Sequence, residues 1–141
     1  MTIQIIPTSQ APDAKPIGLS RTLTTTWTSI IEVPSFEVPQ QSFGGGVDVV
    51  PGVAEIISPM LVSNKTETTA TISIRIYRIE TESYFTVVNE LPIPTFDLIP
   101  IPLNGQFIYS GDIVEVQSSL NDSIDITMSY TIGQAEENDV V

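Results

Sequence analysis

Residues 91–132 read LPIPTFDLIPIPLNGQFIYSGDIVEVQSSLNDSIDITMSYTI and consist of three short β-forming runs separated by turns. Prolines, Asn104-Gly105, Ser110-Gly111-Asp112 and Asn121-Asp122 are the turn-forming residues between the runs. No residue between them is suited to nucleophilic or metal chemistry. The stretch predicts a compact β module that works by contact, and it leaves the partner unidentified.

Residues 70–79 show the cleanest alternation of apolar and polar side chains in the chain. Polar residues and Tyr77 fall on one face, and four apolar residues fall on the other: Ala70, Ile72, Ile74 and Ile76. This alternation predicts an antiparallel strand with one buried face and one wet face. Residues 84–88 are expected to return as its hairpin partner.

Two segments nearer the N-terminus also predict strands. Residues 21–33 are rich in β-branched residues and predict one strand with Trp27 and Ile31 pointing inward. Residues 53–63 predict a strand that bends at Pro59 and lies at a sheet edge, because proline cannot donate a hydrogen bond to a ladder.

The two ends of the chain are expected to add little to the core. Residues 1–20 contain three prolines and predict an extended N-terminal arm, within which residues 3–6 could add a short strand. Residues 124–132 predict the closing strand, and Gly133 is expected to end it. Residues 134–141 then form an acidic, mobile tail.

Two connections shape the expected fold. Residues 40–52 include three consecutive glycines and predict a flexible loop or hinge. Residues 91–102 carry four prolines and predict a stiff, extended crossover between two sheets. Seven to nine short strands without a helix predict an all-β, antiparallel β-sandwich over residues 21–133, with jelly-roll or immunoglobulin-like topology.

Composition excludes several classes of function. The chain has 141 residues and a net charge of −12, with only five basic residues, so neither nucleic acid nor an anionic membrane is an expected partner. It has no cysteine and no histidine, which removes disulfides, thiol chemistry, the usual zinc sites and the commonest general base. We therefore expect no enzyme activity and no cofactor.

The N-terminal residues lack a basic region followed by a long apolar run, so we expect no signal peptide. No window approaches the roughly 20 apolar residues that a membrane-spanning helix needs.

Two pairs of carboxylates are candidates for acid–base chemistry or calcium binding. Asp112 and Glu115 lie near one turn, and Asp122 and Asp125 lie near the next. We interpret them as solvated turn and strand residues, because aspartate is ordinary at turns and no calcium-loop pattern is present.

Arg75 and Arg78 are three residues apart on one predicted strand and should therefore point to opposite faces. Each is expected to pair with a nearby acid, such as Glu80 or Glu82, rather than to form a basic patch.

Aromatic residues are candidates for contact with a partner. Tyr77 lies opposite the isoleucine face and is the best candidate for an exposed anchor, with Tyr109 a second, whereas Trp27 is expected to fill the core. A surface of such residues could also stack against sugars.

The order of three motifs resembles small virion structural proteins of tailed bacteriophages, especially cyanophages. These motifs are LNGQF at residues 103–107, SGDIVEV at 110–116 and IDITMSY at 124–130. The likeness extends over residues 45–133 and includes VAEIISPMLVSN at 53–64.

The resemblance implies a capsid decoration or cement protein that acts through protein–protein contacts in the virion, after assembly in the host cytoplasm. A neck or tail accessory protein, including a fibre that binds a receptor or carbohydrate, is the alternative. The implied partners are other copies of the chain, expected as a trimer, and virion proteins such as the major capsid protein. No catalytic, cofactor or metal residues follow from it. The contact candidates are Tyr77, Tyr109, Ile3, Ile5, Pro92 and Pro94.

Overall fold

The computed structural model of the chain describes residues 2–7, 16–39 and 46–138. This described part contains thirteen strands and no helix, and hence no helix that could cross a membrane. The strands are β1 (Thr2–Pro7), β2 (Ile17–Thr22), β3 (Thr28–Glu32), β4 (Phe36–Pro39), β5 (Val47–Val50), β6 (Gly52–Ile56), β7 (Met60–Asn64), β8 (Ala70–Arg78), β9 (Ser83–Ile93), β10 (Leu98–Ile101), β11 (Phe107–Tyr109), β12 (Ile113–Ser118) and β13 (Ile124–Asn138).

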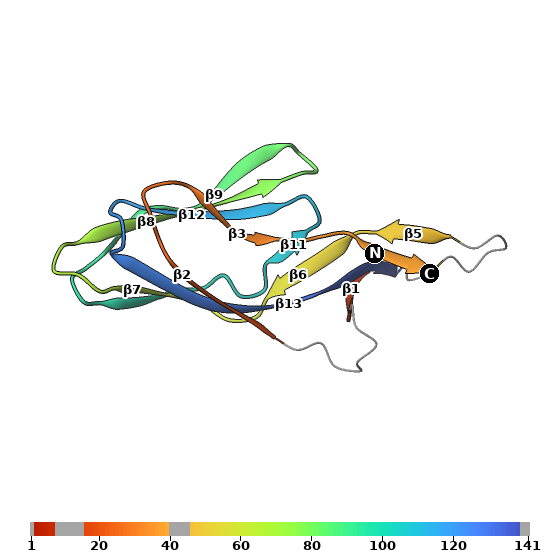
Figure 1. The fold of residues 1–141 in the computed structure, drawn as a ribbon, viewed down its shortest axis with the longest axis horizontal. Helices are drawn as coiled ribbons and strands as arrows, with labels where there is room; N and C mark the ends of the chain where they lie inside the picture. The colour runs from red at the N-terminus through yellow and green to blue at the C-terminus, as the bar shows by residue number, and fades with distance from the viewer. Residues whose placement is uncertain (1, 8–15, 40–45, 139–141) are drawn as a thin grey trace.

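Two antiparallel sheets form an elongated sandwich, and a ribbon of β4 and β5 extends from one end (Figure 1). One sheet has the order β3-β12-β8-β9. In the other sheet, β2 and β1 follow one another along one side of β13, and β7 and β6 follow one another along its other side. Strands β10 and β11 pair with the outer sides of β7 and β6.

The order of pairing is that of a jelly roll. From β2 to β13, leaving out the separate β4–β5 ribbon, the strands fill eight positions when β6 and β7 are counted as one and β10 and β11 as another. In chain order the positions are β2, β3, β6 with β7, β8, β9, β10 with β11, β12 and β13. The first position pairs with the last, the second with the seventh, the third with the sixth and the fourth with the fifth. This is a long two-stranded ribbon rolled into two facing sheets. The prediction of an antiparallel β-sandwich is confirmed, and the topology is the jelly roll of the two alternatives.

The core lies between the two sheets and is made almost entirely of aliphatic side chains. The inward positions predicted on β8 are confirmed, because Ala70, Ile72 and Ile74 are completely buried and Ile76 is 4 % exposed. They pack with buried residues of β12 and β13, which include Val114, Val116, Ile124, Ile126 and Met128. Burial of each large aliphatic side chain contributes roughly 1.5–3 kcal/mol to stability.

Residues 21–33 do not form the single predicted strand. They contain the end of β2, a connection between the sheets, and β3. Strand β3 pairs with β12 through a bulge that leaves Ile30 as the extra residue, so Ile30 and Ile31 are both buried. The inward position of Ile31 is confirmed. The inward position of Trp27 is wrong, because Trp27 precedes β3 and is only half-buried, outside the alternation.

Residues 53–63 contain two strands, β6 and β7, separated at Ile57–Pro59 as the proline predicts. The predicted edge position is wrong. Strand β13 lies on one side of both strands, and β10 and β11 lie on the other. Proline is tolerated here because it lies in the break between the two strands rather than inside a ladder.

The chain ends take a larger part in the sheet than predicted. Strand β1 pairs with the end of β13, and β2 begins at Ile17, with Leu19 only 6 % exposed, so the sheet includes part of the expected arm. Gly133 does not end the closing strand, because it pairs with Val53 on one side and Pro7 on the other. The expected tail is therefore strand as far as Asn138; residues 8–15 and 139–141 lie outside the described residues.

Two predicted connections have mixed outcomes. The segment 40–52 is not one loop, because Val47–Val50 forms β5 and Gly52 begins β6; residues 40–45 lie outside the described residues. The proline-rich segment does cross from β9, at the edge of one sheet, to β10, at the edge of the other, but the crossover is shorter than predicted. Residues 91–93 belong to β9 and 98–101 form β10, so only residues 94–97 connect the two sheets. The Asn104-Gly105 turn is not of the primed type, because only Gly105 has a positive φ (93°).

Candidate functional site

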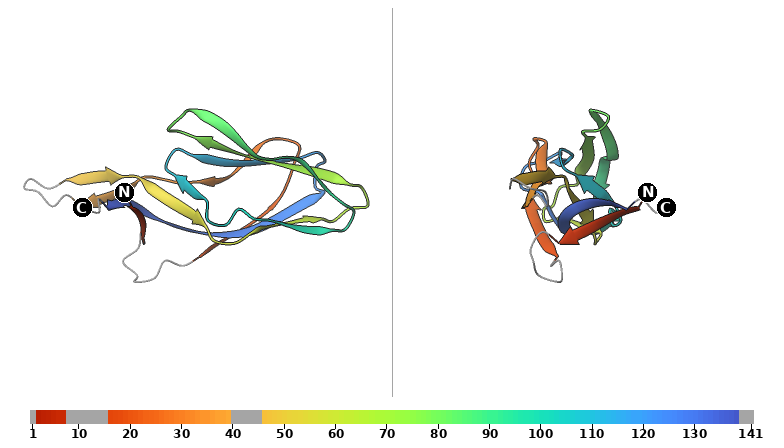
Figure 2. Two further views of the ribbon diagram at one scale, coloured as in Figure 1. Left: turned by 180° about the vertical axis from the view of Figure 1, so that it is seen from behind. Right: turned by 90° about the vertical axis from the view of Figure 1, so that its right-hand side faces the viewer.

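The hairpin of β8 and β9 projects from the sandwich and carries exposed apolar side chains. Figures 1 and 2 show its closed end rising away from the opposite sheet. Ile79, Tyr84, Phe85 and Val87 are 45 %, 53 %, 51 % and 41 % exposed. A cluster of large apolar side chains on one projecting element is typical of a surface that another molecule covers.

A groove lies beneath the projecting hairpin, between its inner face and β11. Its cavity volume is about 620 Å³. The walls are mainly apolar and include Ile76, Ile79, Phe85, Val87, Phe107 and Tyr109. Arg78, Asp112 and Glu80 also line it. Arg78 and Asp112 form an ion pair with each other, so Glu80 leaves the groove with an acidic group at the hairpin turn.

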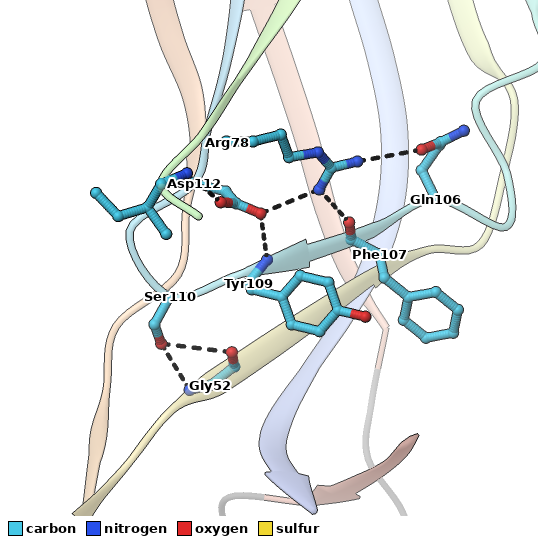
Figure 3. Close-up of polar contacts among 8 residues, drawn as sticks. Gly52, Arg78, Gln106, Phe107, Tyr109, Ser110 and Asp112 are labelled. Carbon is cyan, nitrogen blue, oxygen red and sulfur yellow. Dashed lines mark hydrogen bonds and ion pairs between the residues drawn. The ribbon is translucent and has the colours of Figure 1, made fainter. Parts of the chain in front are cut away.

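Asp112 holds the hairpin to β11 in the other sheet (Figure 3). Its side chain is almost completely buried. Oδ1 accepts a hydrogen bond from the backbone N–H of Ile79 at 2.9 Å, and Oδ2 accepts one from the backbone N–H of Tyr109 at 3.0 Å. Nη1 of Arg78 donates to Oδ2 at 3.0 Å and to the carbonyl oxygen of Phe107 at 2.7 Å. Charge-assisted bonds of this kind fix the position of the groove walls.

The neighbouring residues of the same turn hold the base of the β4–β5 ribbon. Oγ of Ser110 accepts a hydrogen bond from the N–H of Gly52 at 2.6 Å and donates one to the carbonyl oxygen of Pro34 at 2.9 Å. Gly111 has a φ of 92°, and a Cβ there would lie 3.0 Å from the side chain of Ile79. Glycine satisfies both constraints, so the turn Ser110-Gly111-Asp112 is a junction for two projecting elements.

The outer face of the hairpin, opposite the groove, carries aromatic rings stacked with an arginine rather than exposed aliphatic side chains. The guanidinium carbon of Arg75 lies 4.1 Å from the ring centroids of both Trp27 and Tyr84, and its Nε donates to Oε1 of Glu115 at 3.0 Å. The rings of Tyr77 and Tyr84 pack with centroids 5.1 Å apart. Because Arg75 covers one face of the Trp27 and Tyr84 rings, less ring surface remains for stacking against a sugar.

The structure places two of the predicted contact residues at this hairpin. Tyr109 lines the groove, whereas Tyr77 lies on the outer face. Pro92 lies near the other end of β9, opposite Thr71, and Pro94 is exposed directly after β9, so neither belongs to the groove. Backbone pairing places Ile3 and Ile5 on β1, opposite Glu137 and Ala135; their side chains lie outside the described residues.

The predictions for the charged residues need correction. Asp112 is not a solvated turn residue, because the hairpin covers it. Arg75 and Arg78 point to opposite faces as predicted, but their partners are Glu115 and Asp112 rather than Glu80 or Glu82. These acids are distant in sequence and reach the arginines only through the sheet pairing of β8 with β12.

The exposed Phe85 and Val87 were missed as contact candidates. The run Tyr84-Phe85-Thr86-Val87-Val88 contains apolar residues at consecutive positions, on a segment already expected to be a hairpin strand. A strand with large apolar side chains on both faces must be covered on both faces or lie exposed, and this signal could have identified it.

Asp125, another of the candidate carboxylates from the sequence, forms a hydrogen bond with Thr22 and an ion pair with Lys65. The hydrogen bond from Oγ1 of Thr22, at 2.6 Å, lowers the pKa of Asp125, and Nζ of Lys65 at 3.1 Å lowers it further against the opposing effect of partial burial. Over the residues that the structure describes, no three acidic side chains are gathered so that they could hold a metal ion.

The fold and the hairpin together define an all-β jelly-roll module with a projecting apolar surface. No protein-family model, curated protein or solved structure matches the chain.

Proposed function

We propose that this chain is a non-enzymatic structural protein of a tailed-phage particle, which decorates or cements the capsid through protein–protein contacts. The observation that carries the proposal is the projecting hairpin with its exposed apolar residues, which buried Asp112 ties to the sandwich through the N–H of Ile79 and the side chain of Arg78. Rigid, exposed aromatic side chains are favoured at protein interfaces because they lose little conformational entropy on binding.

Two further points support this role. The turn Ser110-Gly111-Asp112, which carries part of the resemblance to virion proteins, is the junction that positions the hairpin. Jelly rolls also recur among viral capsid domains, although lectin domains share the fold and function cannot be taken from fold alone. The proposed partners are the major capsid protein and other copies of the chain, with a trimer expected.

A neck or tail accessory protein that binds a receptor or carbohydrate is the second candidate. Tyr109 favours it, because its side chain lines a groove large enough for a small ligand. The stacking of Arg75 on Trp27 and Tyr84 disfavours a sugar platform on the outer face.

Particles purified on a density gradient test the proposal. We expect the chain to co-purify in fixed ratio to the major capsid protein, and to occupy regularly repeated capsid positions in an electron cryo-microscopy map. Density confined to the neck or tail would support the second candidate. Absence of the chain from particles would overturn both, and a monomer in light scattering at particle-like concentration would contradict the expected trimer.

A further inference from the structure

We propose that the first part of β9, Ser83–Thr86, is an acceptor edge to which an extended segment of another protein adds as a strand. The segment would alternate apolar side chains with polar ones and carry lysine or arginine. The inference deepens the proposed function, on which it rests, by naming the surface and the chemistry of the partner.

The edge of β9 is open only in its first part. Strand β9 is the outermost strand of its sheet, so one side of its backbone has no partner among the described strands. Residues Ser83–Thr86 pair continuously with β8, whereas bulges at Val87 and at Asn89-Glu90 interrupt the later part, and Pro92 removes a donor there. Bulges and proline are devices that block strand addition, and Ser83–Thr86 has neither.

Four other edge strands of the two main sheets offer a poorer acceptor. Strand β10 contains Pro100, and β11 has only three residues. Strand β3 has its bulge at Ile30. Strand β2 is regular, but Ile17 at its start is its one exposed large apolar residue, and the exposed Ser20 and Arg21 provide no apolar contact for an incoming strand.

Side chains on both faces of Ser83–Thr86 would contact an added strand. Successive side chains of a strand point to opposite faces, so an added strand would place alternate residues on each side of the sheet. One set would lie beside Tyr84 on the outer face. The other would lie beside Phe85, over the groove of about 620 Å³. Main-chain hydrogen bonds would supply affinity, and packing of the apolar set against one of these surfaces would supply specificity.

Charge determines which partner fits. The chain carries a net charge of −12, so a second copy would bring the same charge to the contact. The turn that closes the hairpin carries Glu80 and Glu82, and no ion pair in the described part of the chain includes either residue. A basic segment would be attracted to this turn, and the attraction would weaken as salt screens it.

The test uses the full chain and a capped eight-residue peptide of alternating valine and lysine. We expect binding to slow hydrogen exchange of backbone amides within Ser83–Thr86, and we expect the same peptide with glutamate in place of lysine to bind roughly tenfold more weakly at low salt. Slowed exchange at β2 or β3 instead, no binding of the lysine peptide, or equal binding of both peptides would overturn the proposal.

A matched pair of variants locates the contact. Phe85→Ser should weaken binding of the lysine peptide roughly tenfold, because it removes the side chain that faces the groove. Phe96→Ser is the control, since Phe96 is 66 % exposed but lies outside the hairpin. Equal loss in both variants would overturn the proposal, and unchanged amide spectra outside the hairpin would show that both variants fold.

The outcomes are separable from those of the proposed function. A failed peptide experiment would remove strand addition at β9 while particles could still contain the chain. Absence of the chain from particles would remove the virion role and leave the measured edge binding intact.

Discussion

Replacement of Asp112 by alanine should destabilise the protein by about 3–5 kcal/mol. The carboxylate accepts hydrogen bonds from the backbone N–H groups of Ile79 and Tyr109 and from Nη1 of Arg78, and it is 3 % exposed. A fully buried N–H left without a partner costs about 1–3 kcal/mol, and the two N–H groups here fall in the lower half of that range because both hydrogen bonds are part-buried. Arg78 adds less, roughly 1 kcal/mol, because its side chain is 26 % exposed and water can replace part of the lost interaction.

Urea denaturation followed by fluorescence of Trp27, the only tryptophan, measures this loss. Trp27 stacks on Arg75 at the outer face of the same sheet, and far-ultraviolet circular dichroism serves as a second probe that reports all strands. Glu80→Ala is the control for removal of an exposed acid and should stay within about 0.5 kcal/mol of wild type.

A double-mutant cycle with Arg78→Met isolates the ion pair from the backbone hydrogen bonds. We expect a coupling energy of about 1–2 kcal/mol between positions 78 and 112, so most of the cost of Asp112→Ala should persist when Arg78 is absent. The reasoning would be refuted if Asp112→Ala were as mild as Glu80→Ala, or if Arg78→Met abolished its whole effect.

Two further predictions concern other parts of the sandwich. Gly52→Ala should lower the free energy of unfolding by roughly 2–3 kcal/mol in urea denaturation, because a Cβ there would lie 2.3 Å from the carbonyl oxygen of Pro34. Gly18→Ala is the control: a Cβ at Gly18 would meet open space, so this variant should change the free energy of unfolding by less than about 1 kcal/mol. Equal effects of the two variants would contradict this account. The lowered pKa of Asp125 means that its ionised form is favoured by folding, so its contribution is present above an unfolded pKa of about 3.9 and is lost as pH falls through the lower folded pKa. Asp125→Asn should therefore lower the urea midpoint slightly at pH 6, and its difference from wild type should shrink as pH falls below about 3.9. A difference independent of pH would rule this out.

The sequence predicted best those elements whose burial differs between two faces. On β8, Ile72 and Ile74 face the core, whereas Thr71 and Arg75 on the other face are only partly buried; Ser73, 8 % exposed, is the exception on that face. Where neighbouring elements partly cover both faces of a strand, or where a bulge shifts its register, the alternation of apolar and polar residues no longer predicts which side chains are buried. The adjacent buried residues Ile30 and Ile31 are such a case, and the bulge depends on pairing with β12 rather than on local sequence.

The site could be predicted less well because its contacts join residues far apart in the chain. Asp112 resembles any turn aspartate in sequence, and it becomes buried only because Arg78, 34 positions away, is brought beside it by the pairing of β8 with β12. The extension of β13 beyond Gly133 has the same origin, since partners on both sides hold the glycine in the strand. Local propensity carries no information about such partners.

The jelly-roll pairing explains why the exposed apolar surface lies on this hairpin and why side-chain hydrogen bonds are needed to hold its turn in place. Within the two main sheets as described, β8 and β9 are the one pair of strands that follow each other directly in sequence; every other strand there pairs with one from elsewhere in the chain. They form the closed end of the rolled ribbon, so their tip can rise from the sandwich without unpairing any other strand. Backbone pairing with β12 holds β8 only as far as Tyr77, so it does not fix the turn that follows. The hydrogen bonds of Asp112 to Ile79 and Tyr109 supply the missing constraint, which is why a single carboxylate should control both the stability of the hairpin and the shape of the groove.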